Sequence, residues 1–258
     1  MTDSKEILKL AVELGNTLLH CGGEIYRVED TIKHILDAFQ IEQYGVYVLS
    51  NGIFASIEEN ETGFCLIRQT QIGEIHLGKI AAINQLSREI CTHKYNETEA
   101  WERLNVCKSL PTPKPLIQGI SCGIGCACFC SIFGGDFPDS VCAFPLGFLL
   151  QCFRIRQEKQ NASKFLTNMI GSAFLTAASF LIFYLSLPVH YDKIVIGGIV
   201  PLLPGIALTT SIRDLFNGDY LSGAIHLLDA LLTAMCIAVG VGFIIVIYRH
   251  FSGGEFIL

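Results

Sequence analysis

Charged side chains are scarce in this sequence, and those present give no basic excess. Asp, Glu, Lys and Arg make up 16% of the residues, the formal net charge is −6, and the mean hydropathy is +0.46. Nucleic-acid binding relies on clustered Lys and Arg residues that neutralise phosphates. We therefore expect no nucleic-acid partner, and the apolar composition indicates a membrane protein surrounded by lipid.

The sequence also lacks the short motifs of common catalytic and nucleotide-binding sites. It contains no phosphate-binding loop, no HExxH motif and no GxSxG motif. Residues 1–19 lack the basic start, apolar block and cleavage site of a secretory signal peptide. We expect no catalytic residue and no cofactor, and an N-terminus that stays in the cytoplasm.

Cysteine, in contrast, is abundant, with eleven residues. The odd number argues against a complete disulfide framework, and six of the cysteines lie within apolar runs. Cys122, Cys126 and Cys130 are spaced by four, so they share one helix face on which a soft metal ion could bind. No His or carboxylate lies near them in the sequence to complete a ligand set. We therefore expect small packing residues and no metal ion.

The distribution of charge divides the chain into two parts. Residues 115–258 hold only 7 of the 18 Lys and Arg residues and 8 of the 24 Asp and Glu residues. The first 114 residues therefore have the charge density of a soluble domain. We predict a membrane all-α bundle of about five transmembrane helices over 115–258, preceded by a small cytoplasmic α+β domain over 1–114 that ends in a Pro-rich linker.

Hydrophobic periodicity predicts the elements of the first domain. A helical pattern begins near Ile7 and ends at Gly22-Gly23, and a second helix follows over 24–39. Alternating apolar residues and the Asn51-Gly52 turn then predict three strands. The predicted strands and the two helices after them cover residues 44–50, 53–58, 64–69, 77–91 and 97–109.

Five apolar segments are long enough to cross a membrane, which takes about 20 residues, or somewhat fewer where flanking residues reach the interface. They are residues 115–133, 137–153, 165–187, 194–212 and 221–248. The basic residues gather on one side of these segments: Lys108, Lys114, Arg154, Arg156, Lys159, Lys164 and Arg213. The positive-inside rule then places the first domain in the cytoplasm and the C-terminus outside.

The fourth segment contains a predicted break. Pro201 and Pro204 each remove a backbone donor, and Gly205 adds backbone freedom. Broken helices often form the substrate site of transporters, where Thr209 and Thr210 could then offer hydroxyl groups. The alternative is a simple kink.

Ionisable residues lie near the start of the fifth segment. His226 and Asp229 are one helical turn apart, and buried ionisable groups in membranes are candidates for function. Because His titrates near neutral pH, the two could relay protons. Alternatively, they pair with Arg213 or Asp214 at the membrane interface.

The first domain has its own charged group, formed by Glu24, Arg27, Glu29 and Asp30. These side chains could perform acid–base chemistry or bind a metal, which would make the chain a membrane-anchored hydrolase. The alternative is a solvated helix face, in which Glu24 and Arg27 pair across one turn and stabilise the helix.

Two long motifs resemble the signatures of the threonine/serine exporter family. The first is GGEIYRVEDT at residues 22–31, and the second is PGIALTTSIRDLFNGDYLSG at residues 204–223. A shorter match, FGGD at 133–136, lies where the family has a Gly-Gly turn. The resemblance runs from about residue 7 to 245. It implies export of threonine, serine or a dicarboxylate such as succinate across the plasma (inner) membrane.

The resemblance also implies partners and site residues. The chain is similar to the larger subunit of a split exporter, which works with a second small transmembrane subunit, and we expect an oligomer. The implied signature positions are Glu24, Arg27, Glu29, Pro204, Gly205, Thr209, Arg213, Asp214, Gly218, Asp219, Ser222 and Gly223. The sequence departs from the family at His226 and Asp229, where members often have Arg and Glu, and this departure leaves the substrate open.

Overall fold

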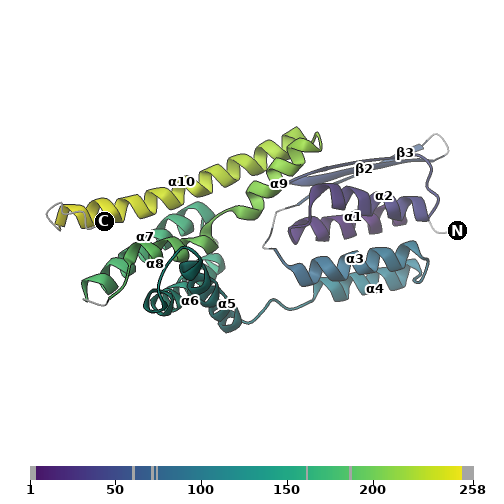
Figure 1. Cartoon of the computed structure of the whole chain (residues 1–258). Helices are drawn as coiled ribbons and strands as arrows, with labels where there is room; N and C mark the ends of the chain where they lie inside the picture. The colour runs from purple at the N-terminus through teal and green to yellow at the C-terminus, as the bar shows by residue number, and fades with distance from the viewer. Residues whose placement is uncertain are drawn as a thin grey trace. The chain divides into compact units, whose positions relative to one another are not determined.

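The structure is a computed structural model that describes residues 4–59, 62–70, 73, 75–160, 162–185 and 188–251. The chain divides into two compact units, Met1–Thr112 and Pro113–Leu258 (Figure 1). The described part of the first unit combines helices with one sheet, whereas the described part of the second unit consists of helices and connecting turns.

The first unit has the predicted α+β composition. Each predicted helix and strand is present, with ends within three residues of those expected. In chain order the elements are α1 (Ser4–His20), α2 (Ile25–Ala38), β1 (Tyr44–Leu49), β2 (Gly52–Glu59), β3 (Thr62–Gln69), α3 (Leu77–Cys91) and α4 (Glu97–Lys108).

Local sequence explains where these helices end and how closely they pack. Gly22, with a φ of +83°, ends α1, because a left-handed residue is strained unless it is Gly. A Cβ atom at Gly15 would lie 2.6 Å from the Ile32 Cδ1 atom, so the glycine lets α1 and α2 approach closely. The Asn96 side chain caps α4 by accepting from the Glu99 backbone N–H at 2.9 Å.

The sheet is antiparallel, with strand order β1-β2-β3. Its pairing places Val48 opposite Ile53, and Ile53 opposite Arg68. Val48, Ile53, Ala55 and Ile57 are buried with the apolar faces of the helices, whereas Phe54 and Ile67, which pair on the other face, are exposed. One face of the sheet therefore forms part of the hydrophobic core of this unit.

The second unit is a bundle of helices that includes one broken helix. Its elements are α5 (Pro115–Ile132), α6 (Phe137–Lys159), α7 (Lys164–Tyr184), α8 (Tyr191–Ile199), the 3₁₀ turn η1 (Val200–Leu202), α9 (Gly205–Phe216) and α10 (Tyr220–Phe251). The last two residues of the predicted third segment, 186 and 187, lie outside the described residues.

Among the described residues, three helices are long and apolar enough to cross a membrane, namely α5, α7 and residues Tyr220–His250 of α10. The bent pair Tyr191–Leu202 and Gly205–Phe216 adds a fourth if it forms one span. The remaining helix, α6, does not meet the criterion, because polar side chains such as Asp139 and Arg154 lower its hydropathy. The count of five therefore stays a prediction.

The cysteines of α5 pack where helix backbones come close together. Cys126 and Cys130 are fully buried, and the Cys126 thiol donates to the Gly198 carbonyl at 3.8 Å. A Cβ atom at Gly197 of α8 would lie 2.6 Å from the Cys130 backbone nitrogen. These thiols therefore pack as small side chains between α5 and α8, as expected.

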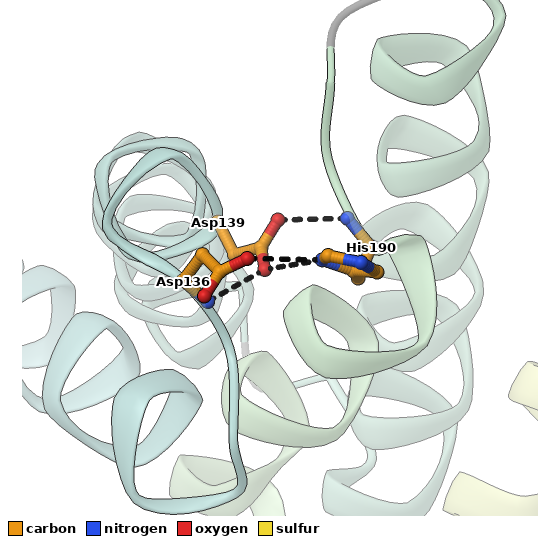
Figure 2. Close-up of side chains that lie close together, drawn as sticks. All are labelled: Asp136, Asp139 and His190. Carbon is orange, nitrogen blue, oxygen red and sulfur yellow. Dashed lines mark hydrogen bonds and ion pairs between the residues drawn. The ribbon is translucent and has the colours of Figure 1, made fainter.

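The N-terminal ends of α6 and α8 meet at Asp139 and His190. The fully buried Asp139 carboxylate accepts from the His190 backbone N–H at 2.7 Å and from the Asp136 backbone N–H at 2.8 Å (Figure 2). The carboxylate therefore satisfies two helix-terminal donors from segments about 50 residues apart in the sequence.

The helices α7 and α10 run parallel and in close contact. The Ser172 hydroxyl donates to the Ile237 carbonyl at 3.2 Å, and the rings of Phe180 and Tyr248 stack with their centroids 4.1 Å apart. Gly240 lies against the backbone of α7 at the Met169 carbonyl. Small residues thus allow these helices the close approach that stabilises helix pairs in lipid.

Candidate functional site

The predicted break in the fourth segment is present. η1 ends at Leu202, α9 begins at Gly205, and the two helical pieces are bent by 54°. Pro204 precedes α9 with φ −81° and ψ 52°, outside the helical region, and it has no N–H to continue the ladder. Backbone groups on both sides of the break therefore lack the partners of a continuous helix.

Arg154, one of the basic residues that indicate the orientation of the chain in the membrane, lies beside this break. The Arg154 Nη1 atom, on α6, is 3.5 Å from the Pro201 carbonyl oxygen and 3.5 Å from the Gln151 Oε1 atom. The guanidinium therefore lies at the carbonyl end of the η1 turn, where a positive charge is favoured. Residues 154 and 201 are 47 positions apart, and no local sequence pattern indicates this contact.

Two glutamines extend the polar contacts from Arg154 to the start of α5. The Gln151 Nε2 atom donates to the Gln118 Oε1 atom at 3.2 Å, and the Gln118 Nε2 atom donates to the Pro113 carbonyl at 3.0 Å. Arg154 is half-buried. The result is a line of hydrogen-bonding side chains that leads from the linker to the break.

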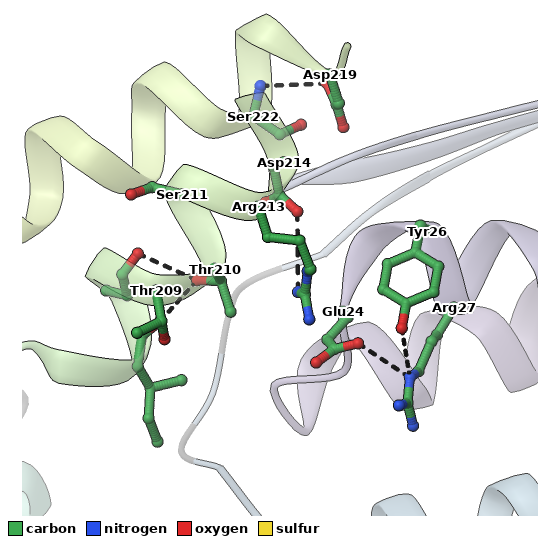
Figure 3. A network of polar contacts seen from close by, with 12 residues as sticks. Glu24, Tyr26, Arg27, Thr209, Thr210, Ser211, Arg213, Asp214, Asp219 and Ser222 are labelled. Carbon is green, nitrogen blue, oxygen red and sulfur yellow. Dashed lines mark hydrogen bonds and ion pairs between the residues drawn. The ribbon is translucent and has the colours of Figure 1, made fainter. Parts of the chain in front are cut away.

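The two threonines of the second signature lie in the first turns of α9. Thr209 donates to the Gly205 and Ile206 carbonyls at 3.1 and 3.0 Å, and Thr210 donates to the Ile206 carbonyl at 2.8 Å (Figure 3). Their hydroxyl protons are thus used within the helix. The oxygen lone pairs can still accept hydrogen bonds from a substrate ammonium group.

Several positions of the second signature shape the corner between α9 and α10. Gly218 has a φ of +86°, and Asp219 accepts from the Ser222 backbone N–H at 3.4 Å, at the start of α10 (Figure 3). A Cβ atom at Gly223 would lie 2.8 Å from the Leu215 Cγ atom. These signature residues therefore serve the turn and the helix packing.

Arg213 and Asp214 lie next to each other near the end of α9. Asp214 is buried, and its Oδ1 atom is 3.9 Å from the Arg213 Nη2 atom. Such a long contact is a weak ion pair by distance alone. Both residues have further interactions in the structure.

The structure gives Asp229 a partner that the sequence did not suggest. The Asp229 Oδ2 atom lies 2.5 Å from the Nζ atom of Lys164, at the start of α7. This ion pair joins α10 to α7. The partner of Asp229 is therefore Lys164, whereas the partners predicted from the sequence were His226, Arg213 or Asp214. His226 is half-buried one turn earlier on α10.

In the first unit, the charged side chains of the first signature are paired along α2. The Arg27 Nε atom is 2.9 Å from the Glu24 Oε2 atom, and the Glu29 Oε1 atom is 2.6 Å from the Lys33 Nζ atom (Figure 3 shows the first pair). The Tyr26 hydroxyl and Glu24 raise the pKa of Arg27. These contacts are ion pairs between neighbouring turns of one helix. They agree with the interpretation of this group as a solvated helix face.

A groove of about 620 Å³ lies between α2 and α3 in the same unit. It is lined by Tyr26, Arg27, Asp30, Thr31, His34, Asn84, Ser87, Arg88, Cys91 and Thr92. Of the predicted signature residues, Arg27 reaches this groove, whereas Glu24 and Glu29 are absent from its lining.

Apolar helices, one of them broken beside a half-buried arginine, define a multi-pass membrane protein of the transporter class. The sequence model of the threonine/serine exporter family, ThrE, matches residues 9–248, and the chain therefore belongs to this family. The family predicted from the two motifs is confirmed.

A curated relative from Klebsiella aerogenes is named a probable succinate transporter subunit, YjjP. It is 21% identical to this chain over 246 residues, which cover 93% of each protein. No solved structure matches the chain. Family and relative both support a transporter and a multi-pass membrane location.

Proposed function

We propose that this chain is a subunit of a secondary active exporter of small hydrophilic metabolites that carry a carboxylate. The substrate is a threonine- or serine-type amino acid or a dicarboxylate such as succinate. A second small transmembrane subunit completes the transport path in the inner membrane. The N-terminal unit is cytoplasmic and the C-terminus lies outside, with α6 as a fifth span. Support comes from the family and from the relative, which is itself named a subunit.

The observation that carries the proposal is the position of Arg154 at the break. A guanidinium group binds a carboxylate through two parallel hydrogen bonds, which gives both charge compensation and orientation. Both contacts of Arg154 with Pro201 and Gln151 use one nitrogen and are 3.5 Å long. A substrate carboxylate offers this group shorter, charge-assisted bonds than the ones it has.

The other predicted residues have supporting roles in this proposal. Pro204 and Gly205 hold the helix open, and Thr209 and Thr210 face the substrate with hydroxyl oxygens. Arg213 and Asp214 form a cytoplasmic gate, to which Asp219 contributes through the α9–α10 corner. His226 and Asp229 couple transport to the ion gradient, with Lys164 as the resting partner of Asp229.

The decisive experiment compares two arginines of α6. Arg154→Gln removes the guanidinium at the break, whereas Arg156→Gln changes an exposed arginine two positions away. Counterflow of labelled serine, threonine and succinate is measured in membrane vesicles that contain each variant at equal amounts. We expect Arg154→Gln to raise the substrate concentration for half-maximal flux by about 10- to 100-fold, the cost of a hydrogen bond to a charged group.

Arg156→Gln is expected to transport normally. Equal transport by both variants would remove Arg154 from the substrate path. Pro204→Ala and Asp214→Asn test the rest of the proposal, because each should reduce flux while the protein still reaches the membrane. Unchanged flux in both would contradict a substrate path along the broken helix.

A membrane-anchored hydrolase is the second candidate function. The pairing of Glu24 with Arg27, and of Glu29 with Lys33, argues against it, because each carboxylate already has a cationic partner on its own helix. Hydrolysis by the full chain that is lost in Glu24→Gln while transport continues would favour this alternative.

A further inference from the structure

A compact group of metal-binding side chains lies where α6 and α8 begin. Figure 2 shows Asp136 and Asp139, from the start of α6, turned toward His190, the residue before α8. The His190 Nδ1 atom is 3.0 Å from the Asp139 Oδ2 atom and 3.8 Å from the Asp136 Oδ2 atom. One ligand atom from each residue lies within 4.8 Å of the others.

The buried carboxylate of Asp139 needs a positive partner. Asp139 is 0% exposed, and a buried carboxylate is costly unless it is paired or coordinates a metal. Lys193, three positions after His190, lies 3.4 Å from the Asp192 carboxylate and is paired there. Without a metal ion, a protonated His190 would be the positive partner of Asp139. The hydrogen bond to Asp139 raises the pKa of His190 and so favours that protonated form.

The separations between the ligand atoms fit a tetrahedral metal ion. Zn²⁺ bonds of roughly 2.0–2.2 Å place neighbouring ligand atoms of a tetrahedral site about 3.3–3.6 Å apart. The observed 3.0 and 3.8 Å lie on either side of this value. Small side-chain rotations of the exposed Asp136 and His190 would equalise them, while backbone hydrogen bonds hold Asp139 in place.

Charge and accessibility agree with the same ligand. Two carboxylates and a neutral imidazole carry a charge of −2, which a divalent cation balances. The side chains of Asp136 and His190 are 74% and 59% exposed, so an ion and its bound water can reach the group from solvent. Imidazole favours Zn²⁺ and similar transition metals over Mg²⁺ and Ca²⁺.

We propose that Asp136, Asp139 and His190 bind one divalent transition-metal ion of the Zn²⁺ class, which joins the N-terminal ends of α6 and α8. The ion replaces the hydrogen bond between the His190 ring and Asp139 with two coordinate bonds. It leaves in place the two backbone N–H bonds to Asp139. The site is independent of the proposed substrate path, because none of its residues takes part in the contacts around Pro201.

The test uses the full chain, purified in detergent, with ZnCl₂ and CoCl₂ as probes. Bound zinc is counted by equilibrium dialysis and elemental analysis, and the coordination of cobalt is read from its absorption spectrum. Two ligand variants are used, His190→Ala and Asp136→Asn. Both keep the backbone hydrogen bonds to Asp139, so α6 retains its cap. Asp192→Asn is the matched control, because it removes a neighbouring exposed carboxylate.

We expect one zinc ion per chain that depends on this group. Each ligand variant should lower the zinc affinity at least about tenfold. Losing a residue that merely hydrogen-bonds to a metal ligand already has an effect of this size. Asp192→Asn should bind as the unchanged chain does. The cobalt spectrum should show nitrogen and oxygen ligands and lose its intensity in His190→Ala.

Three results would overturn the proposal. One is a chain that binds no zinc at micromolar concentration. Another is equal zinc affinity in the unchanged chain and both ligand variants. A third is a cobalt spectrum dominated by thiolate-to-metal charge transfer that the variants leave unchanged, because the ion would then be held by cysteines.

Discussion

The close contact between α7 and α10 gives a sharp test of the second unit. A Cβ atom at Gly240 would collide with the Met169 carbonyl and the Ser172 hydroxyl, whereas a Cβ atom at Gly242 would meet nothing within 4 Å. Gly240→Ala and Gly242→Ala make the same chemical change on one helix, two residues apart. Any gain in helix propensity is therefore common to both, and only Gly240→Ala forces the helices apart.

The expected cost of Gly240→Ala follows from overpacking. Inserting a methyl group into a tight contact costs about 1–3 kcal/mol. The Ser172 hydrogen bond to Ile237 is also weakened, and such bonds in membranes are worth about 0.6 kcal/mol. Because 1 kcal/mol moves the midpoint of a chain of this size by roughly 2–4 °C, the unfolding midpoint should fall by several degrees.

The assay must report on the second unit. The single tryptophan, Trp101, belongs to the first unit and is unsuitable. In a protein whose first-unit cysteines, Cys21, Cys65, Cys91 and Cys107, are replaced by alanine, a dye that fluoresces on reaction with thiols detects the exposure of the buried Cys126 and Cys130 when the second unit melts. Equal midpoints for the Gly240→Ala and Gly242→Ala proteins would refute the close packing of α7 against α10 at Gly240.

Two further predictions concern the first unit. Leu104→Ala removes a fully buried side chain and should cost about 2–5 kcal/mol in denaturant unfolding followed at Trp101, while Val106→Ala, at an exposed position of the same helix, should cost little; similar losses would contradict the assigned core. The hydrogen bond to Asp37 raises the pKa of Tyr44 to about 12. The stability that it adds is therefore complete below pH 10 and is lost as the pH rises through 12. Asp37→Asn should move the NMR titration midpoint of Tyr44 toward 10, and an unmoved midpoint would contradict this cause.

Local features of the sequence were sufficient to predict the helices and strands of the first unit and the break in the fourth apolar segment. The period of apolar residues predicted each helix and strand of the first unit, because the spacing of the buried side chains along the chain differs between a helix and a strand. Pro201 and Pro204 predicted the break, because a missing N–H acts within one helical turn. The two signature motifs likewise predicted the family.

The tertiary structure alone decided which distant residues meet. The contacts Arg154 with Pro201, Asp139 with His190, and Lys164 with Asp229 join positions 47, 51 and 65 residues apart. Periodicity places a residue on a face of its own helix, but says nothing about which other helix that face contacts.

The helix α6 shows how these two levels differ. Judged by composition, α6 is a poor candidate for a membrane-spanning helix, because it contains Asp139 and Arg154. In the fold, Asp139 binds the start of α8 and Arg154 reaches the break that follows η1. The sequence determined that the second part of the chain is apolar and broken at Pro204. The packing of α6 against the broken helix decided where its polar groups lie, because a buried charge is tolerated only beside a partner, and only the fold supplies one.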